Sequence, residues 1–136
     1  MSICHRITNR GRETVALAPF THPEWALAAF GDDAKVRLRR ADGAWTRLPL
    51  NPERRDNRDL EFAGDAKPVG LWELGSAVQP FVLRESFEAD QVQHARLVLS
   101  RRAGHVSLQL QFKPQTLLPG DSVVLCTTWQ FPSRTA

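Results

Sequence analysis

The pair His22-Pro23 is the first candidate for a side chain that could carry out acid–base chemistry. The pair follows a short extended segment and opens a predicted helix, so the imidazole could project from the rim of a folded domain. Imidazole titrates near neutral pH and can donate a proton to a bound substrate. The alternative is structural: His22 orders the turn and Trp25 packs beneath it.

The segment 105–113 presents a second candidate surface, because apolar and polar residues alternate along it without a fault. Alternation places His105, Ser107, Gln109 and Gln111 on one face of a strand. Amides and hydroxyls in a row can hydrogen-bond the hydroxyls of a sugar, and a tryptophan such as Trp25 offers a flat apolar platform for the sugar ring. The alternative is that this face is only solvated and that the tryptophans belong to the core.

Paired carboxylates for glycosidase-type chemistry are a third candidate. Glu73, Glu85 and Glu88 are available, but their spacing alone does not show that any two of them converge. The sequence also contains no glycine-rich phosphate loop and no Gly-x-Ser-x-Gly elbow, which are the motifs of nucleotide binding and serine hydrolysis. We therefore assign no catalytic residue from the sequence.

The metal-binding and thiol residues are sparse. The four histidines show no close pairing and no Cys-x-x-Cys accompanies them, so we predict neither a metal site nor a cofactor. Cys4 and Cys126 are near opposite ends of the chain and could pair if the terminal strands are neighbours. Because the first residues lack the apolar core of a signal peptide, we expect free thiols in a cytoplasmic protein.

Length and composition indicate one soluble domain over residues 1–136. Hydrophobic residues make up 42% of the chain and charged residues 24%, which excludes a disordered or fibrous protein. No apolar run approaches the ~20 residues that a membrane helix needs, so no membrane partner is expected. The formal charge is +3, but the arginines are interleaved with fifteen carboxylates. We interpret this as a mixed-charge surface, and a nucleic-acid partner is not favoured.

The elements that must position these residues read as short strands joined by turns. Thr21, Pro23 and the alanine-rich segment that follows predict one short helix near residues 23–30, ended by Gly31. The remaining segments alternate or are bounded by turn residues. The expected strands cover 3–8, 14–18, 35–39, 44–48, 69–74, 78–85, 95–99, 105–113 and 122–131, with hairpins joining 3–8 to 14–18 and 35–39 to 44–48. A polar, turn-rich loop is expected over 49–68. The fold class predicted is all-β, an antiparallel β-sandwich of about eight short strands.

Two segments carry a resemblance to a known family. The N-terminal residues 7–11 (Ile-Thr-Asn-Arg-Gly) and 15–23, which end in Thr21-His22-Pro23, resemble the galactose-mutarotase-like β-supersandwich proteins, although Glu24 separates Pro23 from the aromatic Trp25. The turn at 118–122 (Leu-Pro-Gly-Asp-Ser), before a strand that ends in Trp129, is similar to the closing turn of the same superfamily and of other carbohydrate-binding β-sandwiches. Together the matches cover about a third of the chain.

The resemblance implies a sugar ligand and a histidine that acts as an acid at the ring oxygen, with His22 at the matching position. The family's base is a glutamate on a late strand, and no glutamate follows Glu88 here. Family members are also roughly twice as long. The leading hypothesis is therefore a carbohydrate- or polyol-binding protein without catalysis, whose ligand-binding residues are His22, Trp25, His105, Gln109 and Gln111.

Two alternatives remain. The first is a protein–protein interaction domain, or a homo-oligomer, that uses an exposed sheet edge. The second is a mutarotase-type sugar isomerase with His22 as its acid, and this alternative requires a carboxylate close to His22.

Overall fold

A computed structural model describes residues 1–50, 57–100 and 103–133. These residues form twelve strands and three single-turn 3-10 helices, and no α-helix lies among them. The strands are β1 (Ser2–Thr8), β2 (Val15–Leu17), β3 (Glu24–Ala26), β4 (Lys35–Arg39), β5 (Trp45–Pro49), β6 (Arg58–Phe62), β7 (Leu71–Gly75), β8 (Val82–Phe87), β9 (Val92–Ser100), β10 (His105–Phe112), β11 (Gln115–Leu117) and β12 (Ser122–Gln130); the 3-10 turns are η1 (Leu27–Ala29), η2 (Gly64–Ala66) and η3 (Ala89–Gln91). The all-β prediction is confirmed.

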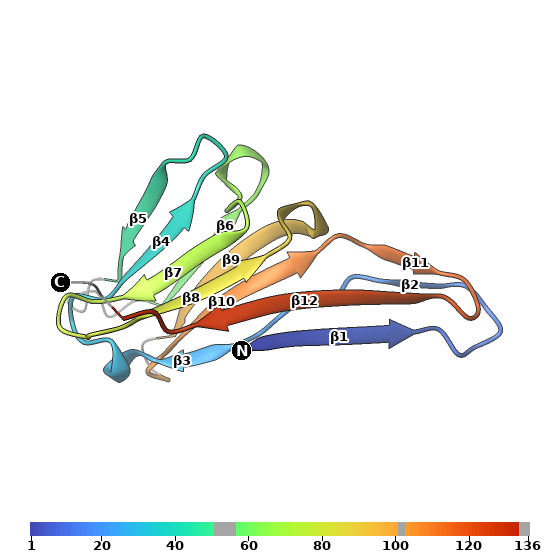
Figure 1. Ribbon diagram of the computed structural model, residues 1–136, viewed down its shortest axis with the longest axis horizontal. Helices are drawn as coiled ribbons and strands as arrows, with labels where there is room; N and C mark the ends of the chain where they lie inside the picture. The colour runs from blue at the N-terminus through green and yellow to red at the C-terminus, as the bar shows by residue number, and fades with distance from the viewer. Residues whose placement is uncertain (51–56, 101–102, 134–136) are drawn as a thin grey trace.

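The strands pair antiparallel in three sheets (Figure 1). A six-stranded sheet has the order β1-β12-β8-β7-β4-β5, a four-stranded sheet has the order β3-β10-β9-β6, and β2 pairs with β11 alone among the described strands. Strands β1, β12, β2 and β11 extend together as an arm beyond the body of the sandwich. The edges β1 and β3 both lie along the lower side of the molecule in this view.

The hydrophobic core lies between the two larger sheets. On β10 the alternation seen in the sequence holds, since Val106, Leu108, Leu110 and Phe112 are all buried. The facing residues come mainly from β4, β7, β8 and β12 of the six-stranded sheet. The polar residues of β10 alternate with its apolar residues on the opposite, outer face of the strand. Ser107 and Gln109 are buried there as well, whereas His105 and Gln111 are partly exposed.

The hairpin over 35–48 is confirmed. β4 and β5 pair from Lys35–Pro49 to Arg39–Trp45, and Gly43 closes the turn with a φ of 81° that favours glycine. The expected hairpin between 3–8 and 14–18 is wrong, because β1 pairs with β12 and β2 pairs with β11. The expected loop over 49–68 contains strand β6; its residues 51–56 lie outside the described part.

The helix expected near residues 23–30 is also wrong. Glu24–Ala26 forms β3, which pairs with His105–Ser107, and only Leu27–Ala29 turns as η1. Alanine and leucine favour a helix by less than about 1 kcal/mol per residue, and pairing at a sheet edge with burial of Trp25 outweighs that preference.

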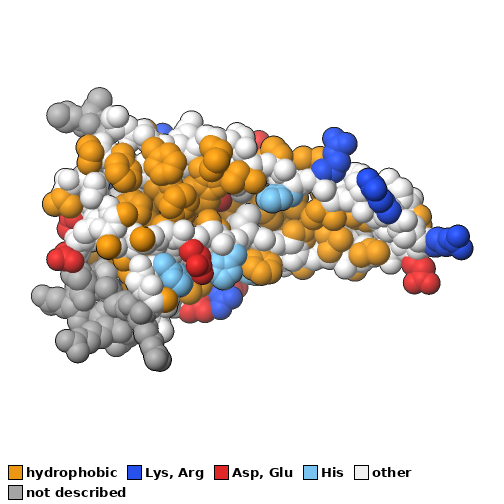
Figure 2. Space-filling view, turned by 90° about the horizontal axis from the view of Figure 1, so that it is seen from below, with side chains coloured by type: hydrophobic (Ala, Val, Ile, Leu, Met, Phe, Trp, Pro, Cys, Tyr) orange, Lys and Arg blue, Asp and Glu red, His pale blue; other side chains and the backbone are white. Residues whose placement is uncertain are grey.

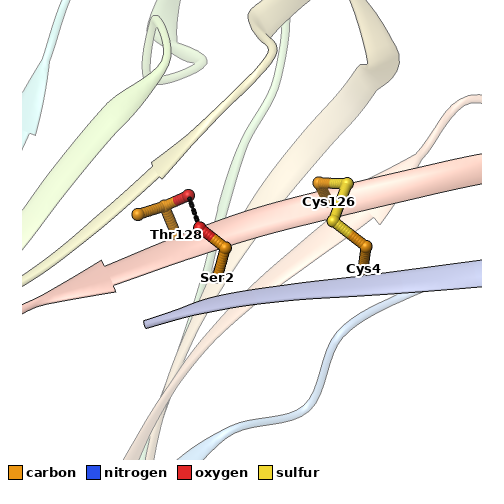
Figure 3. Close-up of a disulfide and its surroundings, with 4 residues drawn as sticks. All are labelled: Ser2, Cys4, Cys126 and Thr128. Carbon is orange, nitrogen blue, oxygen red and sulfur yellow. Dashed lines mark hydrogen bonds between the residues drawn. A yellow bond between two sulfur atoms is a disulfide. The ribbon is translucent and has the colours of Figure 1, made fainter.

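The expectation of free thiols is wrong as well. Cys4 and Cys126 lie directly opposite each other on β1 and β12 and form a disulfide across 122 positions of sequence (Figure 3). Two residues further along the same face, the hydroxyls of Ser2 and Thr128 are 2.8 Å apart and form a hydrogen bond. Adjacent terminal strands were the condition for pairing, and the sheet order supplies it.

Candidate functional site

The segment from Pro19 to Glu24 fixes the candidate histidine against β10. The Thr21 N–H donates to the Leu110 carbonyl (2.9 Å), and the Leu110 N–H donates to the Thr21 hydroxyl oxygen (3.0 Å). The Gln111 amide and the Phe112 N–H both donate to the Pro19 carbonyl, each at 2.9 Å. These bonds make the segment a continuation of β3, so His22 emerges beside the outer face of the four-stranded sheet.

A carboxylate lies between two histidines on this face. Glu24 Oε1 is 3.3 Å from His22 Nε2 and 3.4 Å from His105 Nε2. The side chains of His22 and Glu24 are about half exposed, whereas that of His105 is more enclosed. All three side chains keep some access to solvent, so a ligand on this face could reach them.

A small hollow lies further along the same face. Phe20, His94, Arg96, Gln109 and Gln111 line it, and its volume is about 120 Å³. Phe20 is 60% exposed and bridges to Gln111, so its ring stands at the mouth of the hollow as an apolar surface. Gln109 is only 8% exposed, so this part of the polar face is not simply solvated.

An ion pair borders the hollow. Arg96 on β9 donates two hydrogen bonds to Asp59 on β6, the first from Nε to Oδ1 at 2.7 Å. These bonds hold the pKa of the Asp59 carboxyl below its usual value and raise the pKa of Arg96. The guanidinium therefore remains a fixed donor group at the edge of the hollow.

The structure brings four of the five sequence-predicted ligand residues to one sheet face. His22, His105, Gln109 and Gln111 share it. Trp25 does not, because it pairs with Val106 on the inner side, where its ring is 5.2 Å from that of Trp129 and 6.1 Å from that of Phe131. Sequence reasoning missed Glu24 and Phe20. A period of two across residues 20–24, read as a strand, would have placed both beside His22.

The three carboxylates considered from the sequence lie elsewhere. Glu73 is held on the outer face of the six-stranded sheet by Arg37 and Arg84, with oxygen–nitrogen distances of 3.2 and 2.6 Å. Glu85 is fully buried inside the sandwich, where the indole N–H of Trp72 donates to it. Glu88 is exposed just before η3. None of the three carboxylates lies beside His22 and His105, and Glu24 is the carboxylate that contacts both histidines.

A larger groove adjoins this face. Its volume is about 780 Å³, and it runs between the inner side of β1 and β12 and the segment 18–23, so Phe20 and His22 line the groove while Phe20 also lines the small hollow. Figure 2 shows apolar side chains gathered in a hollow on the lower face, with histidine and acidic side chains next to them.

Over the residues that the structure describes, no group of three or more metal-binding side chains forms, and none of the helical segments is long and apolar enough to cross a bilayer.

Comparison of the sequence with family models and with characterised proteins finds no match. Comparison of the structure finds clear matches. The Slr1438 protein from Synechocystis sp. PCC 6803 matches with a TM-score of 0.74 over 98% of this chain and 50% of its own, at 14% identity. A galactose mutarotase-like protein from Lactobacillus casei matches with a TM-score of 0.67 over 96% of this chain and 58% of its own, at 13% identity.

A galactose mutarotase-like protein from Clostridium acetobutylicum matches with a TM-score of 0.68 over 98% of this chain and 52% of its own, at 8% identity. The chain therefore has a galactose mutarotase-like fold along nearly its whole length, rather than in a third of it. It spans about half the length of these structures.

Proposed function

We propose that the outer face of the four-stranded sheet binds a carbohydrate or a similar polyol without catalysing a reaction on it. The observation that carries the proposal is the hollow at Phe20, where one exposed aromatic ring adjoins the amides of Gln109 and Gln111. An apolar ring face beside several hydrogen-bonding groups is the combination that a sugar ring requires, since one side of the ring is apolar and its rim is polar. The galactose mutarotase-like fold supports the same ligand class.

Each residue has a distinct part in this binding. Gln109 and Gln111 offer amide groups to sugar hydroxyls, and Phe20 takes the platform role that the sequence suggested for Trp25. The pair of His22 and His105 with Glu24 supplies further acceptors and donors at the other end of the face. Trp25 supports the site from the inner side of β3 through its packing on Trp129.

The test is calorimetric titration of the protein with a panel of monosaccharides, disaccharides and polyols. We expect at least one member to bind, and Phe20→Ala to weaken it about tenfold, as expected when an aromatic anchor is removed. Phe131→Ala is the matched control, since Phe131 is 53% exposed but packs near Trp25 and Phe81, away from the hollow. Lack of binding across the panel, or equal losses in both variants, would contradict the proposal.

Sugar mutarotation is a second candidate, because Glu24 provides the carboxylate that the sequence left missing beside His22. In this reaction His22 would donate a proton to the ring oxygen as the ring carbon–oxygen bond breaks. Glu24 would accept the proton of the anomeric hydroxyl, giving the open-chain aldehyde, and the reverse steps would close the ring on the other face.

Polarimetry of freshly dissolved α-D-galactose and α-D-glucose tests this candidate separately from binding. An isomerase should accelerate the change in rotation beyond the buffer rate. Glu24→Gln should abolish the acceleration, while a closed methyl glycoside should still bind at the Phe20 hollow. A rate equal to that of buffer, in a protein that binds the sugar, leaves binding as the function.

A further inference from the structure

The groove beside the candidate site is lined by residues that are typical of a protein core rather than of a surface. Its floor is formed by Phe112, Leu125 and Trp129, all of them core residues, and its walls by Ile3 and Ile7 on β1 and by the segment that carries Phe20. Among the described residues that line the groove, only Arg6 has a permanent charge. An apolar hollow of this kind, open on a folded domain, marks an interaction surface.

Both sheets end at this groove with an unpaired edge. Among the described strands, β1 pairs only with β12, and β3 pairs only with β10. β1 is seven residues long, contains no proline and shows no irregularity in its pairing with β12, so it lacks three of the devices that usually protect an edge strand: shortness, proline and a bulge. Two free edges that flank an apolar groove leave one side of the sandwich open to another β-sheet layer.

The accessible surface area of the chain is larger than a compact domain of this mass would have, as expected if one side of the sandwich is open. The chain exposes 8298 Å². A compact monomer of 15.3 kDa is expected to expose about 7,100 Å². The excess is about 1,200 Å². Each partner in a standard protein–protein interface buries roughly 800 Å², so the excess is large enough to supply such an interface.

We propose that this groove is the interface of a symmetric dimer, in which a second copy of the chain covers it and pairs along the β1 edge. Self-association suits the chemistry, because a face with a single fixed charge meets its own copy with little like-charge repulsion, and a twofold interface requires such self-complementarity. Sugar binding is not a premise of the dimer. Phe20 and His22 line the groove as well as the candidate site, so the second copy would lie against both side chains.

Sedimentation equilibrium on the oxidised protein tests the dimer. We expect a dimer at about 10 μM, a concentration at which micromolar and tighter dimers persist. Ile3→Glu should weaken dimerisation by about 100-fold or more, since the change occurs twice in a symmetric interface and puts two carboxylates in an apolar groove. Val124→Glu is the matched control, because Val124 is 41% exposed against 38% for Ile3 but does not line the groove.

The outcomes separate clearly. A wild-type protein that remains monomeric at about 100 μM overturns the proposal. A dimer that survives Ile3→Glu, or that Val124→Glu weakens equally, places the interface elsewhere and also overturns it. Near-ultraviolet circular dichroism of both variants verifies that each remains folded. Failure of the sugar titration would leave this result unchanged, so the two proposals can fail separately.

Discussion

Glu85 makes the stability of this protein strongly dependent on pH. Its side chain is fully buried between the sheets on β8, opposite Trp129, and the indole N–H of Trp72 donates to Oε2. Oε1 has no hydrogen-bond partner among the described residues. Burial raises the pKa of Glu85 from 4.5 to about 8, against the opposing effect of the Trp72 hydrogen bond. The carboxyl is therefore protonated in the folded protein at neutral pH.

The magnitude follows from the two pKa values. Below pH 4.5 the carboxyl is protonated in both states and carries no ionisation penalty. Between pH 4.5 and about 8 the unfolded chain releases a proton that the folded chain keeps, so the free energy of unfolding falls as pH rises. The slope is about 1.4 kcal/mol per pH unit, which gives a loss of about 5 kcal/mol across this window. Above about pH 8 both states are ionised and the loss stays constant.

Glu85→Gln isolates this effect, because glutamine has nearly the shape of a protonated glutamate and can still accept the Trp72 hydrogen bond. Urea unfolding of both proteins, with the disulfide kept intact, should give similar free energies near pH 4.5. The variant should then become the more stable protein by about 3 kcal/mol near neutral pH. All other titrating groups cancel in the difference. If the free energies of unfolding of the two proteins change in parallel across this pH range, the pKa of Glu85 is not raised in the folded protein and the reasoning is refuted.

Three further changes test particular contacts by urea unfolding. Gly70→Ala should lower the free energy of unfolding by about 1–2 kcal/mol more than Gly43→Ala. Both glycines have positive φ, but a Cβ at Gly70 would meet the Phe87 carbonyl oxygen at 3.1 Å, whereas a Cβ at Gly43 would meet no atom within 4 Å. Equal losses of stability in the two variants would contradict this crowding. Leu108→Ala should cost about 2–5 kcal/mol because Leu108 is fully buried, and a loss below about 1 kcal/mol would mean that the core there is not closely packed. Reduction of the disulfide, measured with and without dithiothreitol, should lower the free energy of unfolding by up to about 4 kcal/mol, because the link closes a very long loop; no change would show that the cysteines are not paired in solution.

The fold could be predicted where the signal is local. The strand that contains His105 alternates strictly, and the 35–48 hairpin has Asp42-Gly43 at its turn, where the Asp42 carboxylate accepts from the Ala44 N–H at 2.9 Å. Neither signal depends on distant residues. The partner of β1 does depend on them, since it lies more than a hundred residues away, and the turn residues at 9–11 were a misleading local signal for a hairpin.

The candidate site was predicted in part for the same reason. The period of two along β10 is enough to place His105, Gln109 and Gln111 on one face of a strand. The role of Glu24 could not be found in this way, because a helix starting near residue 23 turns Glu24 away from a strand neighbour such as His105. Its contact with both histidines depends on β3 pairing with β10, which is a tertiary interaction.

The disulfide between the terminal strands gives the backbone the topology of a ring. Residues 4–126 form a closed covalent loop, so one peptide-bond break anywhere between the two cysteines opens the loop but leaves a single molecule. A protease that cuts the exposed turn at Asp42-Gly43 would produce two pieces that separate on a gel only after reduction. New chain ends could be placed at that turn while the disulfide still links the two resulting segments covalently.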